Sequence, residues 1–259
     1  MLQAISVSKR YHKDYVLKNI NLTLNSGDKV GIVGLHNSGK TVLMKLLAGD
    51  EKPSSGKILI DGNKLDKRKI AYIPQIPLFD PILKAKDIIR YVGDEEYLEK
   101  VNIDKEKKIK NMSLGEKKRL SLALSLSFSP EYLLIDDITM DEESKEFFLD
   151  FIRKFHGGVA VSYHNLKDVW EVIDKIIILS KGSISFIGKK DDIKFKIIKI
   201  RNSADVLRFF TKYYMKEGEY VEIWEEFSDN SVEEKLKALG INYDTIEASP
   251  DEIFLRFFA

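Results

Sequence analysis

The residues with the clearest chemistry form a glycine-rich loop. Residues 34–41 read GLHNSGKT and fit the pattern Gly-x-x-x-x-Gly-Lys-[Ser/Thr]. Glycines let such a backbone wrap tightly and turn its N–H groups toward phosphate oxygens. A helix that begins at the end of the loop presents its positive N-terminus to the same anion. The pattern therefore predicts that this chain binds the phosphates of a nucleotide.

Two side chains of the loop are expected to act directly on this ligand. Lys40 has the charge and the reach to bind the β- and γ-phosphates, and the Thr41 hydroxyl can ligate Mg²⁺. His36 is expected to be a solvated loop residue rather than a catalyst. The predicted nucleotide-binding residues of the loop are Gly34, Leu35, His36, Asn37, Ser38, Gly39, Lys40 and Thr41.

The flanking patterns predict the elements that hold the loop. Residues 29–34 are almost entirely apolar, as in a buried parallel strand, and residues 41–49 have the apolar spacing of a helix that stops at a glycine. Further strands are predicted at residues 5–11, 17–25, 56–62, 69–74, 132–138 and 158–164, with a hairpin at 175–188. Helical periodicity extends over residues 78–103, where Pro81 and Gly93 interrupt it, and over residues 113–130, where Pro130 ends it. The alternation of strands and helices indicates an α/β protein.

Composition argues against several classes of protein. The chain has 259 residues, a formal net charge of +1 and no cysteine, so neither nucleic-acid binding nor disulfides nor thiolate catalysis is indicated. The N-terminal stretch lacks the build of a signal peptide, and no apolar run is long enough to cross a bilayer. We therefore expect a cytoplasmic chain, which needs a membrane-spanning partner if it works at a membrane.

Six features in a fixed order resemble the nucleotide-binding subunits of ATP-binding cassette (ABC) transporters. They are an aromatic residue, the phosphate loop, a glutamine, a signature segment, a Walker B strand and a histidine, over roughly residues 1–190. In this chain they are Tyr11, residues 34–41, Gln75 in AYIPQ, the segment NMSLGEKKRLSLALSL, Asp136 in YLLIDDIT and His164 in AVSYHNL. The resemblance implies that ATP and Mg²⁺ are the cofactors.

The resemblance implies further contacts to the nucleotide. Tyr11 stacks its flat face on adenine. Ser113, Gly115 and Glu116 belong to the signature segment, which closes over the nucleotide held by a second chain in a dimer. Asp141 in MDEES corresponds to the D-loop aspartate of the family, after a segment that is about two residues shorter than usual.

The resemblance also implies the catalytic and metal-binding residues. Asp136, at the end of its strand, holds Mg²⁺ through water, together with Thr41 and Gln75. Asp137 stands where the family has its catalytic glutamate, and His164 contacts the γ-phosphate and the attacking water. The implied catalytic residues are therefore Asp137, His164 and Gln75.

The chain departs from the family pattern at several of these positions. Asp137 is one methylene shorter than glutamate, so its carboxylate sits about 1.5 Å further from the water, and such a displacement can cost roughly a hundredfold in rate. We therefore expect slow hydrolysis. Leu114 and Glu116 replace a glycine and a glutamine of the signature, and Asn37 replaces a glycine of the loop. Asparagine tolerates left-handed backbone, so nucleotide binding is expected to survive.

The resemblance implies a domain organisation. Residues 1–190 are expected to form an ABC-type P-loop NTPase domain, with a mainly parallel sheet, antiparallel N-terminal strands and a short helical subdomain at about 76–130. Residues 191–259 are expected to form a small α+β domain. The terminal EASPDEIFLRFFA resembles the end of an accessory domain of drug-resistance exporters, which implies an exporter. The alternative is an unrelated dimerisation or regulatory module.

The implied function is hydrolysis of Mg-ATP in a dimer that drives a transporter. The partners would be a second ABC ATPase chain and an integral membrane permease, and the chain would lie at the inner face of the cell membrane. A face near Phe79 and Pro81 is expected to receive the permease. One alternative is a catalytically weak, ATP-gated subunit of a heterodimer, which Asp137 and Leu114 favour. The other is an ABC protein that serves no transporter; no nucleic-acid partner is expected.

Overall fold

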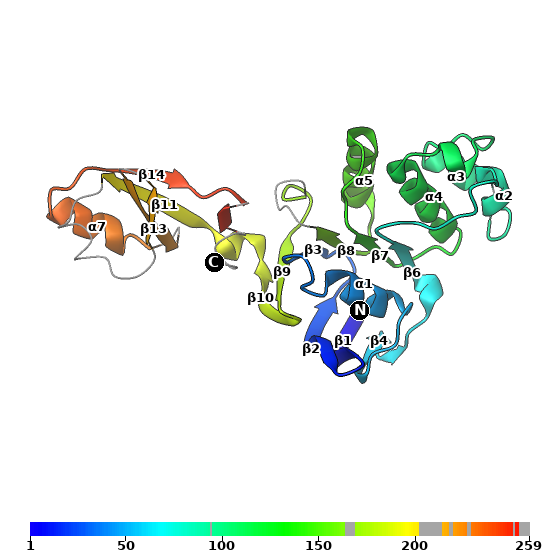
Figure 1. Cartoon of the computed structure of the whole chain (residues 1–259), viewed down its shortest axis with the longest axis horizontal. Helices are drawn as coiled ribbons and strands as arrows, with labels where there is room; N and C mark the ends of the chain where they lie inside the picture. Colours follow the sequence, from blue (N-terminus) through cyan, green and yellow to red (C-terminus); the bar gives the residue numbers. More distant parts are fainter. Residues whose placement is uncertain are drawn as a thin grey trace. The chain divides into compact units, whose positions relative to one another are not determined.

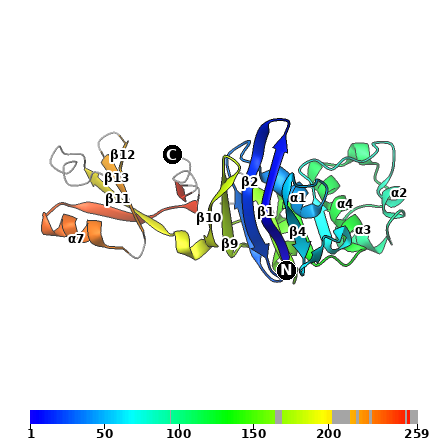
Figure 2. The same cartoon turned by 90° about the horizontal axis from the view of Figure 1, so that it is seen from below.

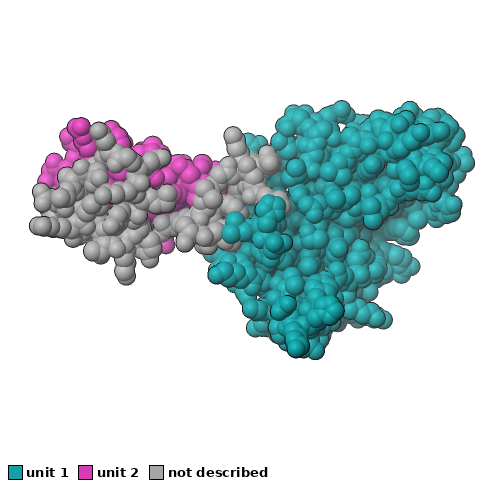
Figure 3. All heavy atoms as spheres, viewed as in Figure 1, with its two compact units in different colours: residues 1–188 teal, residues 189–259 magenta. Residues whose placement is uncertain are grey.

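The structure of the chain is a computed structural model, and it consists of two compact units. It describes residues 1–93, 95–163, 169–201, 214–217, 220–226, 229–250 and 252–253. The units are residues 1–188 and 189–259, which Figure 3 colours separately. Each unit contains its own cluster of buried apolar side chains and is described by itself.

The first unit begins with an antiparallel sheet. Its strands, in spatial order, are β2 (Asp14–Leu24), β1 (Leu2–Tyr11), β4 (Ser55–Ile60) and β5 (Asn63–Lys64). β1 pairs antiparallel with both β2 and β4. Asn19 has a φ of 48°, and the register between β1 and β2 shifts beside it. This bulge lets Leu17 and Ile20, three residues apart, both reach the core.

The second sheet is mainly parallel and carries the phosphate loop. Its strands, in spatial order, are β10 (Ser183–Lys189), β9 (Lys175–Ser180), β3 (Lys29–Val33), β8 (Gly158–Tyr163), β7 (Tyr132–Asp136) and β6 (Ile70–Ile73). The five strands from β9 to β6 run parallel. β7 and β8 are buried along their whole length, which explains their continuous apolar sequences. Because these strands are parallel, the residues that follow β3, β7 and β8 meet at one edge of the sheet.

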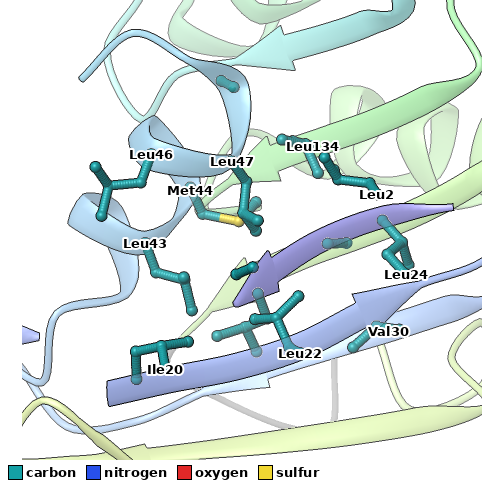
Figure 4. Packing of buried hydrophobic residues seen from close by; sticks show 14 of the residues in the cluster. Leu2, Ile20, Leu22, Leu24, Val30, Leu43, Met44, Leu46, Leu47 and Leu134 are labelled. Atoms are coloured by element: carbon teal, nitrogen blue, oxygen red, sulfur yellow. The ribbon is translucent and has the colours of Figure 1, made fainter. Parts of the chain in front are cut away.

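Helix α1 (Lys40–Ala48) lies in the core between the two sheets (Figures 1 and 4). Its buried residues, among them Met44 and Leu47, belong to one cluster with Ile20 of β2 and Leu134 of β7. The helix ends at Gly49, whose φ of 75° is the left-handed conformation of a glycine C-cap. The packed helix fixes the position of the loop that precedes it.

The other described α-helices of the first unit follow β6 and β7. They are α2 (Ala85–Ile89), α3 (Glu96–Lys100), α4 (Leu114–Leu126) and α5 (Glu142–Lys154). Described 3-10 helices occur at Lys67–Lys69 and Ile109–Asn111 in this unit, and at Lys190–Ile193 at the start of the second unit. The periodicity of residues 78–103, with its predicted breaks at Pro81 and Gly93, corresponds to the short helices α2 and α3. Pro81 has no N–H to donate and Gly93 is a poor helix former, so the helices are confined to short segments.

The second unit is a four-stranded antiparallel sheet with one described α-helix. Its elements are β11 (Phe195–Arg201), β12 (Tyr214–Glu217), β13 (Tyr220–Glu226), α7 (Ser231–Ala238) and β14 (Tyr243–Glu247), with spatial order β12-β13-β11-β14 (Figure 2). Leu236 of α7 packs with Ile198, Ile200, Val221 and Ile223 of the sheet. In the same unit, the buried Lys196 pairs with Glu225.

The predicted α/β architecture is confirmed in its main features. These are the mainly parallel sheet, the antiparallel N-terminal strands, a short helical segment and an α+β second unit. In the described part of the chain, no helix is both long enough and apolar enough to cross a membrane.

Candidate active site

A cavity of about 340 Å³ opens at the edge where β3, β7 and β8 end. Its lining residues are Val16, His36, Asn37, Ser38, Gly39, Lys40, Thr41, Val42, Gln75, Asp136, Asp137 and Ser162. Most of these residues were singled out from the sequence. The structure therefore brings the phosphate loop, the glutamine and both aspartates together. Ligands of open parallel sheets bind at this kind of edge.

The loop between β3 and α1 has the conformation that its glycines permit. Gly39 has a φ of 105°, and Asn37 has a φ of 63°. Asn37 therefore occupies the left-handed region, which asparagine tolerates better than most residues. Gly34 is needed for space, because a Cβ there would lie 2.4 Å from both the Leu179 carbonyl oxygen and Ser38 Oγ. The backbone of α1 begins directly after this loop, so the N-terminus of the helix lies at the cavity.

Lys40 is buried and donates to the loop itself. Its Nζ lies 2.6 Å from the carbonyl oxygen of Gly34 and 3.1 Å from that of Leu35. Burial lowers the pKa of Lys40, and the negative charges of Asp136 and Asp137 oppose that shift. A bound phosphate would offer stronger, charged acceptors to the same ammonium group.

Asp136 has the surroundings of a cation ligand. Its Oδ1 accepts hydrogen bonds from Ser162 Oγ at 2.6 Å and from Thr41 Oγ1 at 3.3 Å. Its Oδ2 is buried and has no hydrogen-bond partner among the described residues. A buried carboxylate oxygen without a donor, beside a hydroxyl, fits a hard cation with oxygen ligands. No group of three acidic or histidine side chains that could hold a metal occurs in the described part of the chain.

Asp137 follows β7 in a left-handed turn with a φ of 62°. Its Oδ2 accepts from Gln75 Nε2 at 2.9 Å, and its Oδ1 accepts from the Thr139 N–H at 2.8 Å. Burial raises its pKa, but the hydrogen bonds from Thr139 and Gln75 and the charge of Lys118 outweigh burial, so its pKa is lowered. The carboxylate is therefore ionised at neutral pH and faces the predicted water-contacting glutamine.

The signature residues form a separate cluster at the start of α4. Ser113 is the N-cap; its Oγ accepts from the Glu116 N–H at 3.1 Å and donates to Asp141 Oδ2 at 3.0 Å. Glu116 completes a capping box by accepting from the Ser113 N–H, and Lys107 also binds its carboxylate. A Cβ on Gly115 would lie 2.1 Å from Ser144 Oγ. None of Ser113, Gly115, Glu116 and Asp141 lines the cavity of this chain.

Three residues that were predicted to act on the nucleotide do not line this cavity or lie outside the described residues. Tyr11 does not line the cavity; its hydroxyl donates to Glu51, and the Lys9 ammonium lies 4.9 Å from the ring centroid. Burial, the hydrogen bond to Glu51 and the charge of that residue raise the pKa of Tyr11 to about 12. Leu35 is 48% exposed. His164 lies outside the described residues.

Sequence reasoning missed two residues around the aspartates. Ser162 bonds the Asp136 carboxylate and also accepts from the Asp137 N–H at 3.1 Å. Lys118 of α4 is fully buried and donates to the backbone carbonyls of Asp136 and Asp137. Burial lowers the pKa of Lys118, and the two aspartates oppose that shift. The sequence contains no signal for this burial, because Lys118 stands in the charged run EKKR.

Comparison with known proteins agrees with this geometry. A family described as ABC transporter matches residues 17–140. The uncharacterised ABC transporter ATP-binding protein YxlF of Bacillus subtilis is 32% identical over 214 residues, which cover 75% of this chain and 72% of YxlF. The spermidine/putrescine import ATP-binding protein PotA of Mesoplasma florum is 26% identical, over 74% of this chain and 63% of PotA.

A solved protein structure has a fold similar to that of this chain. It is described as the dimeric structure of a post-hydrolysis state of the ATP-binding cassette MJ0796, bound to ADP and phosphate. The similarity has a TM-score of 0.64 and 25% sequence identity, and it covers 73% of this chain and 98% of that one. The predicted cassette type of P-loop NTPase fold is thereby confirmed.

Proposed function

This chain belongs to the ABC transporter family as an ATP-binding subunit with ATPase activity, and from that premise we propose that it hydrolyses Mg-ATP in a dimer to drive a membrane permease. The observation that carries this proposal is the convergence of Lys40, Thr41, Gln75, Asp136 and Asp137 on one cavity. These residues supply a cation for phosphate, oxygen ligands for a metal and an ionised carboxylate for water. Phosphoryl transfer needs these three functions.

Lys40 and the backbone N–H groups of the loop would hold the phosphates. Thr41 Oγ1 and the Asp136 carboxylate are the groups that would face Mg²⁺, with Gln75 at the same cavity. The bound metal would neutralise charge that develops on the phosphate oxygens. Asp137 would orient the attacking water, for which its lowered pKa keeps it ionised. Its short side chain supports slow turnover.

Dimer formation is supported by the position of the signature residues. Ser113 and the N-terminus of α4 lie apart from the cavity of their own chain, so they are suited to the nucleotide of a second chain. Leu35 in the phosphate loop is 48% exposed and Leu114 in the signature is 39% exposed. These are the two segments that would meet across the dimer. MJ0796, which shares the fold, is dimeric by its description.

Turnover is expected to require both Mg²⁺ and a second chain. Below the dimer dissociation constant, a tenfold dilution should lower phosphate release per chain by about tenfold, because the dimer fraction follows mass action. Chelation of Mg²⁺ should abolish release, and added Mg²⁺ should restore it. A rate per chain that stays constant on dilution, down to nanomolar protein, would count against a dimeric site. Ultracentrifugation over the same concentrations is the control.

A membrane permease is proposed to dock on the segment that follows Gln75. Leu78 is 89% exposed, Ile82 is 75% exposed and Tyr91 is 83% exposed, whereas Ile89 belongs to the core. Phe79, half-buried, lies next to this surface. Exposed apolar side chains gathered on one segment mark an interaction site.

The docking surface can be tested by charge insertion. Leu78→Glu and Ile82→Glu are each expected to weaken capture of a multi-span permease from detergent-solubilised membranes by about thirtyfold, as for an interface anchor. ATP turnover of the isolated chain should not change. Leu239→Glu is the matched control, because Leu239 is 43% exposed but lies in the second unit. Equal capture by all three variants would rule out this surface.

An exporter with an accessory second unit is supported by the C-terminal sequence resemblance, part of which lies outside the described residues. PotA, a relative, carries an import function by its name, so transport direction remains a proposal for this chain. A cytoplasmic position at the inner face of the membrane follows from the proposed permease. The formal charge of +1 gives no reason to expect a nucleic-acid partner.

A second candidate is an ATP-gated subunit that binds ATP tightly but turns it over poorly beside a more active chain. It is favoured by the Asp137 carboxylate, whose two oxygens are already held by Thr139 and Gln75. ATP binding without hydrolysis in the homodimer, with hydrolysis restored by a second ABC chain, would support this candidate.

A further inference from the structure

Helix α4 contains a buried lysine that faces the turn after β7. Lys118 is fully buried, and its Nζ donates to the carbonyl oxygen of Asp137 and lies 3.4 Å from that of Asp136. Within the described residues it forms no ion pair with a carboxylate. A buried ammonium group is costly unless its donors are satisfied, so these two carbonyls account for its presence in the core.

The two carbonyls belong to the last residue of β7 and to the residue that follows it, beyond the end of the pairing with β6. The last residue of β7 paired with β6 is Ile135, so the ladder on that side has ended before Asp136. At Asp137 the backbone turns left-handed, with a φ of 62°. A non-glycine residue holds this conformation only when its surroundings stabilise it. Lys118 donates a hydrogen bond to the carbonyl oxygen of Asp137, the residue that has this left-handed conformation.

We propose that Lys118 is a positioning residue: it holds the turn at Asp137 so that the Asp137 carboxylate faces Gln75, and it connects this carboxylate to the helix that begins at Ser113. The proposal rests on the proposed role of Asp137 in ATP hydrolysis. Lys118 is five positions after Ser113, which corresponds to about 7.5 Å along the rigid helix. When Ser113 binds the nucleotide of the second chain, a displacement of α4 moves the Lys118 ammonium relative to the turn. Each nucleotide would thereby affect the carboxylate that acts on the other.

Lys118→Met tests this role, because methionine has similar length but no donor. We expect the single-turnover rate constant for Mg-ATP hydrolysis to fall at least tenfold, with the ATP dissociation constant changed less than twofold. Lys118→Gln retains neutral donors and should give an intermediate rate constant. Lys154→Met, the same change at an exposed lysine at the end of α5, is the matched control and should leave the rate constant unchanged. A titration of ATP-binding sites per chain counts folded sites separately from the rate constant.

A purely structural role predicts a different result. It would lower the thermal midpoint and the number of ATP-binding sites per chain in both Lys118 variants but leave the rate constant of the remaining active sites unchanged, which would overturn the proposal. Combination with Asp137→Asn separates this failure from failure of the proposed function. If Lys118 acts through Asp137, Lys118→Met should add less than twofold to the loss in the Asp137→Asn background. Full turnover by Asp137→Asn alone would instead contradict the proposed role of Asp137, and absence of Mg-ATP hydrolysis by the wild-type chain would contradict the proposed function.

Discussion

Replacement of Lys40 by alanine is expected to lower single-turnover hydrolysis of Mg-ATP by roughly 10²–10³-fold, as for the loss of a preorganised donor at the site of developing charge. Lys40 is buried at the cavity, beside Asp136 and Asp137. Its present acceptors are the neutral carbonyls of Gly34 and Leu35. Phosphate oxygens would replace these acceptors in the bound state, and the phosphate loop contains no other lysine and no arginine.

The measurement is release of radiolabelled phosphate with protein in excess over ATP. Lys45→Ala, on the same helix α1 but outside the cavity lining, is the matched control and should retain turnover. Because the Gly34 and Leu35 carbonyls lose a donor in Lys40→Ala, thermal unfolding must be measured beside the rate. Turnover retained by a folded Lys40→Ala protein would refute the phosphate-binding role of the loop.

Replacement of Asp137 is expected to lower the rate of ATP hydrolysis when the charge is removed and to raise it when the side chain is lengthened. Asp137→Asn keeps the shape but removes the charge that orients water, and should lower the rate about a hundredfold or more. Asp137→Glu extends the carboxylate by one methylene, about 1.5 Å, and should raise the rate between about tenfold and a hundredfold. ATP affinity should change little in either variant, because the loop and not Asp137 is expected to bind the phosphates.

Local hydrogen bonding limits the increase in hydrolysis rate that is expected for Asp137→Glu. Asp137 Oδ1 accepts from the N–H two residues later, at Thr139, and this Asx-type turn depends on the short side chain. A rate that stays equal or falls in Asp137→Glu would mean that the turn has already placed the aspartate correctly. Equal rates for Asp137→Asn and the wild-type chain would exclude Asp137 as the group that orients water.

The local motifs of the site were predictable because their geometry depends on sequence neighbours. The spacing in residues 34–41 requires a tight loop before a helix, and the structure has that loop between β3 and α1. The apolar runs before Asp136 and His164 predicted buried parallel strands, which are β7 and β8. Parallel strands put their carboxyl ends at one edge, so the meeting of Lys40 and Asp136 also followed from the strand pattern.

Contacts between distant segments required the tertiary structure. The direction of the Tyr11 side chain depends on Glu51, which is 40 residues away. Nothing in the sequence indicated that Ser162 is a common hydrogen-bond partner of Asp136 and Asp137, because a serine in a strand has no sequence pattern of its own.

By itself, the sequence determined the cassette class, the phosphate loop and the order of its accompanying motifs, because these depend on residue types at fixed short spacings. Only the tertiary structure decided which polar groups satisfy one another in the core. Lys118 reads as one more charge in the run EKKR, yet packing of α4 against the end of β7 buries it completely and leaves the carbonyls of Asp136 and Asp137 as its acceptors. Burial and hydrogen-bond partners arise from segments brought together by folding, which local spacing does not encode.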